Sequence, residues 1–289
     1  MIRRFLSTWT AAAVAAAMVA APAAGDAMSI YDIQYTTDPD GGSSSAGTVV
    51  DCTGGIVTHK WSGGQLKLTL QDPNYPDGWG AIQVKDWTGG GLYHGVSPGD
   101  WVELFSVLIE EFRGNTLITY DSGTNPCFQV RASGLALPGP KVVAPCEIAA
   151  PIEQPNGDWL VADHAPEKYE AMWLSVANVT VGEMDLGKAA DNYELAAQAA
   201  TCWAADYMND EVEADGYHRY VATAQTFESV SGILEQYTRP EAGWDYYQLV
   251  TTRTSDFVIP EPASAGLLVL AGGMGLLRRR RPGGAAEKR

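Results

Sequence analysis

Short alternating runs of hydrophobic and polar residues dominate the middle of the chain. Between residues 48 and 120 many apolar positions recur every second residue, which is typical of strands with one buried face. The predicted strands are 48–58, 65–71, 80–85, 101–112 and 116–120. About five short strands in roughly 85 residues, with no convincing helix between them, favour a small closed or nearly closed β-barrel.

Two glycine-containing stretches refine this pattern. Gly54 and Gly55 interrupt the first strand, and a glycine break suits a bulge or a sharp bend of a barrel strand. Arg113-Gly114-Asn115 separates the strands 101–112 and 116–120, so it predicts a hairpin turn.

The second half of the chain repeats this order weakly. Its strand-like segments are 170–181, 193–207, 227–237 and 246–250. We therefore predict an all-β protein with one barrel over 28–133, a Pro-rich linker over 134–168 and a second barrel over 169–257. The alternative is one β-sandwich that uses strands from both halves.

Several short motifs of the first half occur in a familiar order. They are Val50 to Val57, Leu-Gln-Asp-Pro at 70–73, Ile82 to Val84, Pro-Gly-Asp-x-Val at 98–102, and Glu-Phe-x-Gly-Asn-Thr at 111–116. This order, over roughly residues 46–133, resembles the OB-fold modules appended to bacterial extracellular nucleases and cell-surface proteins. The resemblance implies two tandem small OB-like barrels. The glycine that this family places within its long strand is replaced here by Leu108 or Ile109, whereas the second half keeps it as Gly232.

The N-terminus is typical of an exported protein. Arg3 and Arg4 precede an Ala-rich apolar run, and small residues follow. This pattern predicts a secretory signal peptide over 1–25.

The C-terminal segment 258–289 combines a Pro-Glu-Pro motif, an uncharged apolar run and an arginine cluster. The motif is Pro260, Glu261 and Pro262, and the run 263–277 is expected to form a single hydrophobic helix. The arginines expected to stop transfer are Arg278, Arg279, Arg280 and Arg281. This order resembles the PEP-CTERM sorting signal, which implies processing by an exosortase-type peptidase. An ordinary C-terminal membrane anchor is the alternative.

The charge balance is strongly acidic. The chain has 19 Lys and Arg against 35 Asp and Glu, a net charge of −16, and without residues 1–25 and 278–289 the net charge becomes −23. Nucleic-acid binding depends on Lys and Arg that neutralise phosphates, so this balance predicts no nucleic-acid partner. It favours divalent cations or basic partners.

The four cysteines suggest disulfides. They are Cys52, Cys127, Cys146 and Cys202. An even number in an exported chain predicts two bonds, and the spacing leaves all three pairings open. None forms a Cys-x-x-Cys pair with a histidine at ligand spacing, so no zinc site is expected.

The search for catalytic motifs finds none. The four histidines have no Ser or Cys partner at a catalytic spacing, and no phosphate loop or nucleophile elbow is present. We therefore expect a protein that is not an enzyme and has no cofactor, with Ca²⁺ at the acidic run Asp206 to Asp215 as the one metal to consider. Trp79 and Trp87 are candidates for stacking on a glycan.

Taken together, these patterns predict an exported, non-catalytic cell-surface or extracellular-matrix protein. Its expected partners are the export machinery, an exosortase-type peptidase and an exopolysaccharide. It would be anchored transiently in the inner membrane before reaching the cell surface. A polysaccharide- or Ca²⁺-binding module is the first alternative, and a hydrolase on an unrecognised β scaffold is the second.

Overall fold

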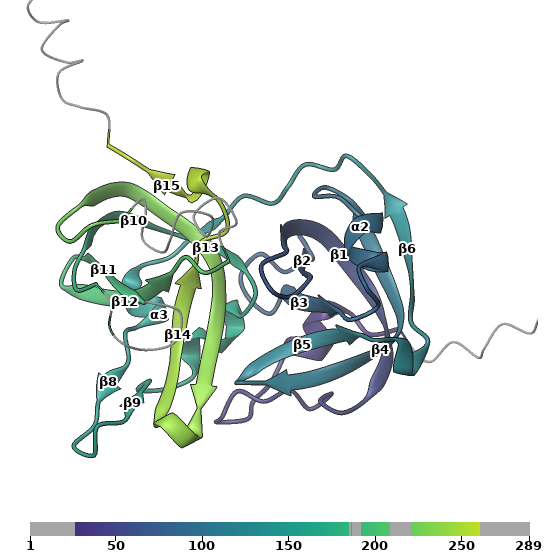
Figure 1. The fold of residues 1–289 in the computed structure, drawn as a ribbon, viewed down its shortest axis with the longest axis horizontal. Helices are drawn as coiled ribbons and strands as arrows, with labels where there is room; N and C mark the ends of the chain where they lie inside the picture. The colour runs from purple at the N-terminus through teal and green to yellow at the C-terminus, as the bar shows by residue number, and fades with distance from the viewer. Residues whose placement is uncertain (1–26, 185, 187–191, 209–220, 261–289) are drawn as a thin grey trace, which may run out of the picture.

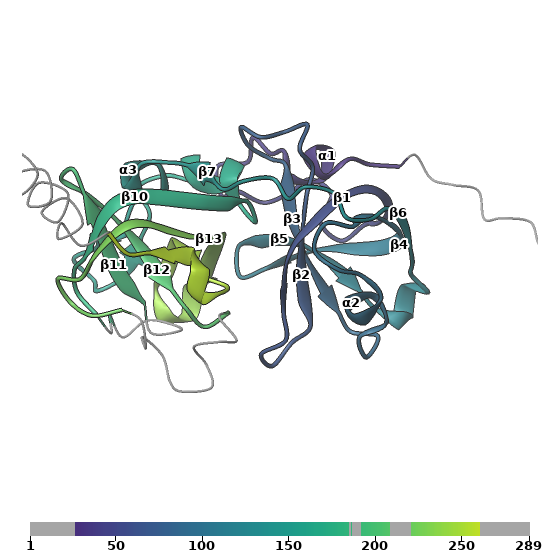
Figure 2. The same ribbon diagram turned by 90° about the horizontal axis from the view of Figure 1, so that it is seen from above.

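Two β-barrels make up the described part of the chain. The computed structural model describes residues 27–260, except residue 185, residues 187–191 and residues 209–220. The barrels lie side by side (Figure 1), and the view from above shows a connection running over both of them (Figure 2). Each barrel has its own hydrogen-bonded sheet. The prediction of an all-β protein with two tandem OB-like barrels is therefore confirmed, and the single-sandwich alternative is wrong.

In barrel 1, five described strands close in the order β1-β2-β3-β5-β4, with β4 returning to β1, and β6 adds to β4. The strands are β1 (Val49–Trp61), β2 (Lys67–Gln71), β3 (Ala81–Asp86), β4 (Trp101–Phe112), β5 (Asn115–Tyr120) and β6 (Cys127–Ala132). The short helices are α1 (Ile30–Gln34), α2 (Gly91–Gly95) and η1 (Ser122–Thr124). The core of the barrel comes from the inward positions of these strands, because neighbouring side chains of a strand point to opposite faces.

Barrel 2 repeats this topology in its described strands, with the closed order β10-β11-β12-β14-β13 and β15 added to β13. The strands are β10 (Trp173–Val181), β11 (Tyr193–Ala197), β12 (Ala200–Ala205), β13 (Thr226–Arg239), β14 (Trp244–Val250) and β15 (Phe257–Val258). The 3₁₀ turns η3 (Pro240–Ala242) and η4 (Thr254–Asp256) lie between the last strands. The parallel pair β12–β14 matches the parallel pair β3–β5 of barrel 1, so the weak sequence repeat corresponds to a structural one.

The segment between the barrels packs against barrel 2. It contains β7 (Lys141–Val142), α3 (Pro145–Ile148), β8 (Ile152–Glu153), β9 (Trp159–Leu160) and η2 (Ala165–Tyr169). Strand β7 pairs with β10, and β9 pairs with β14. Ile148 is fully buried in the core of barrel 2. The segment is therefore held along its length, although its composition suggested an extended connection.

Glycines in the long strands allow neighbouring strands to approach closely. Gly54 has φ +77°, and a Cβ there would lie 1.6 Å from the carbonyl oxygen of Val102 in β4, so the two strands approach more closely than any side chain allows. At Gly232 a Cβ would lie 2.5 Å from the carbonyl oxygen of Val250. Strand β4 has no glycine and bends instead at Ser106, whose φ is +54° and whose N–H donates to Asp51 Oδ1 at 2.9 Å.

The predicted disulfides are absent. All four cysteines are free thiols, and Cys127 and Cys146 are exposed. Cys52 belongs to the core of barrel 1 and Cys202 to the core of barrel 2, so two separate hydrophobic cores keep them apart. Burial raises the pKa of each of these two thiols to about 12, which keeps them protonated and unreactive near neutral pH.

Both predicted targeting segments lie outside the described residues. These are the signal peptide 1–25 and, in the tail, Glu261, Pro262, the apolar run and the four arginines. Within the residues that the structure describes, none of the helices has the length and hydropathy needed to cross a bilayer.

Candidate functional site

A pocket of about 420 Å³ opens where the outer faces of the two barrels meet. We call it the inter-barrel pocket. Barrel 1 lines it with Trp61, Gly63, Gly64, Gln65, Lys67, Gln83, Lys85, Phe112, Arg113, Asn115 and Leu117, and barrel 2 with Tyr207, Glu235, Tyr237 and Gln248. On β3, Ile82 and Val84 point into the barrel core while Gln83 and Lys85 line the pocket, as the period of two requires.

Positive charge gathers in this pocket. Lys67, Lys85 and Arg113 are three of the nine Lys and Arg residues that the structure describes. The Nζ atom of Lys67 lies 3.9 Å from Glu235 Oε1, a long ion pair. The Nζ atom of Lys85 lies 3.6 Å from the centre of the Phe112 ring, and no salt bridge to a described carboxylate accompanies that contact. The pocket therefore carries more positive than negative charge.

The two lysines are held in an unfavourable electrostatic environment. Burial and repulsion from Lys67 lower the pKa of Lys85 to about 8, against the attraction of Glu235. Burial likewise lowers the pKa of Lys67. An anion placed between these ammonium groups would relieve their repulsion, so the geometry favours an anionic ligand.

Two side-chain N–H donors of the pocket lining lack a partner. These are Gln83 Nε2 and Trp61 Nε1, both buried and without a hydrogen bond to any described residue. A buried donor without an acceptor costs roughly 1–3 kcal/mol. A ligand that brings acceptor oxygens would satisfy donors and cations together.

Aromatic rings form the walls of the pocket. Trp61 meets Tyr207 edge to face at a centroid distance of 5.8 Å, and the guanidinium of Arg113 lies 5.1 Å from the ring of Tyr237. Phe112 is 47% exposed beside Lys85. Rings next to cations suit a ligand that carries both flat groups and negative charge.

Glu235 is the carboxylate of the pocket lining, and its oxygens are already occupied. It accepts hydrogen bonds from the Tyr207 hydroxyl and from Gln248 Nε2, the latter at 3.1 Å. Gln248 in turn accepts from Asn192. This network holds the barrel 2 wall in place, so Glu235 opposes an incoming anion less than a free carboxylate would.

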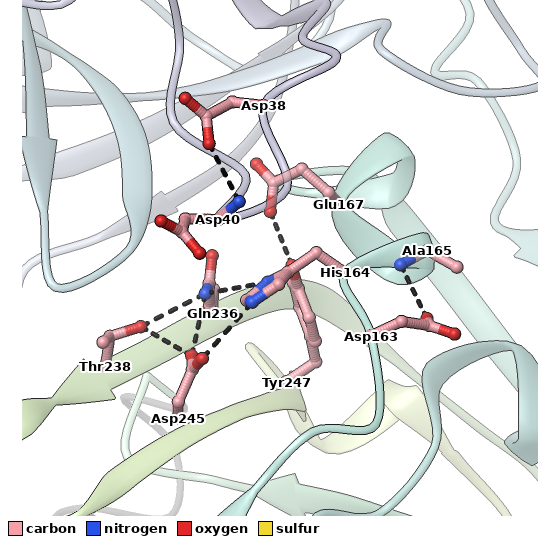
Figure 3. Close-up of polar contacts among 10 residues, drawn as sticks. All are labelled: Asp38, Asp40, Asp163, His164, Ala165, Glu167, Gln236, Thr238, Asp245 and Tyr247. Atoms are coloured by element: carbon pink, nitrogen blue, oxygen red, sulfur yellow. Dashed lines mark hydrogen bonds and ion pairs between the residues drawn. The ribbon is translucent and has the colours of Figure 1, made fainter.

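A second polar cluster lies on the other side of β13. Because side chains alternate along a strand, Glu235 and Tyr237 face the pocket while Gln236 and Thr238 face this cluster. Figure 3 shows Gln236 and Thr238 meeting Asp245, with Gln236 Nε2 at 2.9 Å from Asp245 Oδ1.

A histidine and a tyrosine extend the cluster. His164 Nε2 lies 3.3 Å from Asp245 Oδ2, and His164 Nδ1 lies 2.9 Å from the hydroxyl of Tyr247 (Figure 3). That hydroxyl donates to Glu167 Oε2 at 2.7 Å. The hydrogen bond that His164 donates to Asp245 raises the pKa of His164. These groups are tied to one another, and none of them lines the inter-barrel pocket.

Three carboxyl groups meet where the cluster touches barrel 1. Glu111 comes from β4, whereas Glu167 and Glu170 come from η2 and the residue after it. Glu170 Oε1 accepts the N–H of Thr116 at 3.0 Å, which ties the two barrels together. Burial raises the pKa of Glu167 to about 8, and burial with repulsion from Glu167 raises the pKa of Glu170. Glu167 is therefore mostly protonated at neutral pH. We call Glu111, Glu167 and Glu170 the carboxyl cluster.

The β4–β5 hairpin joins this cluster to the pocket. Asn115 Nδ2 donates to the carbonyl oxygen of Gln236 at 2.5 Å, and the N–H of Gln236 donates to Asn115 Oδ1 at 3.1 Å. The N–H of Thr238 donates to the carbonyl oxygen of Arg113 at 2.8 Å. These bonds hold Arg113 against Tyr237 at the edge where the two barrels meet in the inter-barrel pocket.

The described residues offer no evident metal centre. No group of three or more His, Cys, Asp and Glu side chains among them is arranged to hold a metal ion. Asp206 is buried at the end of β12, and the rest of the acidic run, from residue 210 to residue 215, lies outside the described residues.

The two tryptophans proposed for glycan stacking occupy different environments. Trp79 has φ +61°, donates its N–H to the carbonyl oxygen of Lys168 at 2.5 Å, and meets Tyr35 edge-on at 5.6 Å. It belongs to the contact between the barrels. Trp87 is 51% exposed and lies beside the inter-barrel pocket, as described below.

Among known proteins, this chain shows similarity to solved structures only. No family model and no curated protein matches the sequence. A murine DNA-binding protein bound to double-stranded DNA matches 70% of this chain and 93% of its own, with 9% identity and a TM-score of 0.33. Fission yeast Pot1 with single-stranded DNA matches 78% and 83%, with 12% identity and a TM-score of 0.29. A replication protein A heterotrimer bound to single-stranded DNA matches 78% and 69%, with 10% identity and a TM-score of 0.23.

These comparisons contradict the expected surface or matrix protein without a nucleic-acid partner, because the matched structures are of OB-fold DNA-binding proteins. At such identities and TM-scores the likeness concerns the fold and assigns no ligand to this chain. Net charge alone does not exclude a nucleic-acid partner. Salt screens the field of distant surface charges within about 8 Å, whereas cations that touch a ligand act directly.

Sequence reasoning did not find the residues of the inter-barrel pocket. The polar face of strand 80–85, with Gln83 and Lys85, was visible in the alternating pattern. The approach of this strand to Tyr237 was not visible in the sequence, since more than 150 residues separate the two walls of the pocket.

Proposed function

We propose that this protein binds single-stranded nucleic acid in the inter-barrel pocket, without catalysing a reaction on it. The observation that carries the proposal is the set of three cations, Lys67, Lys85 and Arg113, together in a pocket walled by aromatic rings. Phosphates would pair with the cations and accept hydrogen bonds from the side chains of Gln83 and Trp61. Unpaired bases would stack on the aromatic rings.

Single strands fit this pocket better than duplexes. Aromatic stacking requires the face of a base, which a duplex hides within its own stack. The pocket also lies on the outer faces of the barrel strands, where OB-folds commonly bind oligonucleotides. The DNA-bound structures named above agree with such a ligand, although the charge and shape of the pocket carry the argument.

The acidic surface shapes the expected affinity. A net charge of −16, or −23 without residues 1–25 and 278–289, slows the approach of a polyanion, so binding should be weak and should depend strongly on salt. If three phosphates are neutralised, the logarithm of the binding constant falls with the logarithm of salt concentration with a slope of about −2.

The test compares two variants that each remove one positive charge. Lys85→Met removes a pocket charge and keeps the apolar stem beside Phe112, whereas Arg131→Gln removes an exposed charge on β6. Fluorescence anisotropy with a labelled thymidine oligonucleotide of about 12 nucleotides measures the affinity at low salt. We expect Lys85→Met to weaken binding roughly tenfold and to reduce the salt slope by about 0.7, with Arg131→Gln close to the unmodified protein.

Two outcomes would contradict the proposal. If both variants bind as well as the unmodified protein, the oligonucleotide does not occupy the pocket. If an acidic oligosaccharide binds more tightly than the oligonucleotide and shows the same loss with Lys85→Met, the pocket serves an anionic glycan.

The proposal includes export of the protein. It is supported by the Ala-rich N-terminal segment, and by the Pro-Glu-Pro motif and arginines that resemble a PEP-CTERM signal. The intact mass of the mature protein from a host with an exosortase tests this part. Loss of residues 1–25 and of the arginine cluster is expected, and retention of both ends would refute it.

A further inference from the structure

Trp87 is a large apolar side chain left in contact with solvent directly after β3. It is 51% exposed, and its backbone is held in place, because its N–H donates to the carbonyl oxygen of Tyr120 at 2.9 Å. It lines a hollow of about 400 Å³, which we call the Trp87 hollow. A rigid backbone with an exposed indole is an arrangement suited to stacking.

The Trp87 hollow adjoins the inter-barrel pocket. Gly64 and Gln65, in the loop between β1 and β2, line both of them. The next residue of that loop fixes the boundary, since the carbonyl oxygen of Leu66 accepts the N–H of Asp86 at 2.8 Å. A strand that leaves the pocket across Gly64 and Gln65 would therefore run toward Trp87.

The chemistry of the two sites differs. The lining of the Trp87 hollow includes no Lys or Arg. Its carboxylate, Asp86, is occupied by the N–H and hydroxyl of Thr88, at 2.9 and 2.6 Å, and by the N–H of Tyr93 at 2.8 Å. The hollow thus offers a ring surface next to a carboxylate whose hydrogen-bonding capacity is largely used. It suits a flat, uncharged group more than a phosphate.

Resting on the function proposed above, we infer that Trp87 stacks a base of the same strand whose phosphates lie at Lys67, Lys85 and Arg113. The binding surface is then longer than the inter-barrel pocket. The preferred ligand is a polymer that occupies both sites, and a mononucleotide fills the pocket alone.

The test is a length series of thymidine oligonucleotides, from the mononucleotide to about 12 nucleotides, on Trp87→Ala and on Lys85→Met. Loss of one stacking contact weakens binding roughly 5- to 100-fold, so Trp87→Ala should show this loss for the long oligonucleotide and no change for the mononucleotide. Trp87→Phe should restore most of the affinity. Tyr35→Ala, an exposed aromatic outside both linings, is the matched control and should bind normally.

The outcomes separate this inference from the proposed function. If Lys85→Met weakens every length while Trp87→Ala weakens none, the pocket binds nucleic acid and Trp87 has no part in it. If Trp87→Ala weakens the mononucleotide as much as the long oligonucleotide, the indole acts on the pocket and the separate stacking site is refuted. If neither variant changes the binding of any length, the proposed function itself fails.

Discussion

At the scale of single residues, Lys85 shows how burial and a neighbouring positive charge act on a cation of the site. Its stem is buried on the outer face of β3, and its ammonium group lies near a second lysine and over the ring of Phe112. Folding therefore places a charge where it is poorly solvated, and a bound anion would offset that cost. A residue of this kind couples ligand binding to its own protonation.

This coupling predicts how affinity depends on pH. With a pKa of about 8, Lys85 is mostly charged at pH 7 and mostly neutral at pH 9 in the free protein. Oligonucleotide affinity should therefore fall as pH rises from 7 to 9, while the phosphates stay ionised throughout. Anisotropy titrations at pH 7, 8 and 9 should show a decline that Lys85→Met lacks. An equal decline in that variant would assign the effect to another group.

At the scale of elements, the β4–β5 hairpin decides how the barrels meet. Its two-residue turn has φ +57° at Arg113 and +84° at Gly114, the left-handed values of the turns that suit tight hairpins. A Cβ on Gly114 would lie 2.5 Å from Thr238 Oγ1 and 2.6 Å from Gln236 Cδ. The glycine therefore both forms the turn and lets its tip approach β13.

Gly114→Ala should damage the contact between the barrels. The left-handed conformation costs about 1–2 kcal/mol for alanine, and the clash with β13 adds to that. We expect a lower melting temperature and weaker oligonucleotide binding, because Arg113 and Tyr237 would move apart. Gly123→Ala, where the added Cβ meets only an ordinary contact at 3.5 Å, is the matched control in calorimetry. Equal melting temperatures for the two variants would contradict this role of Gly114.

At the scale of the whole molecule, the carboxyl cluster makes the contact between the barrels sensitive to protons. Glu167 is buried, and its pKa of about 8 is far above the usual value of 4.5 for a glutamate. The folded protein therefore binds more protons at this site than the unfolded chain does between these two pH values. The contribution of Glu167 to stability is fully present below pH 4.5 and is lost as pH rises through about 8.

Glu167→Gln should remove this dependence. The amide stays neutral and its oxygen can still accept from the hydroxyl of Tyr247. We expect the variant to melt near the temperature of the unmodified protein at pH 5 and well above it at pH 9, as measured by circular dichroism. Glu228→Gln, at an exposed position of β13, should leave the pH profile unchanged. A profile for Glu167→Gln that follows the unmodified protein would refute a proton held at this site.

Local patterns in the sequence determined the elements and the barrels. Alternation along 80–85 and 101–112 marked strands with one buried face, and Gly54 and Gly232 marked the close approaches that closure requires. The order of the strands in each half then pointed to two barrels. These features depend on residues near one another in the chain, so the sequence carries them directly.

Only the tertiary structure determined which cysteines and which charged side chains come together. It left all four cysteines as free thiols, with Cys52 and Cys202 buried in separate cores where they cannot pair with each other. It also brought Lys67, Lys85 and Arg113 together in one pocket, which makes a cationic pocket in an acidic protein. Net charge sums over all residues, whereas a ligand meets only those that folding brings together. Which residues a ligand meets depends on distances between residues far apart in the chain, and no local sequence pattern encodes those distances.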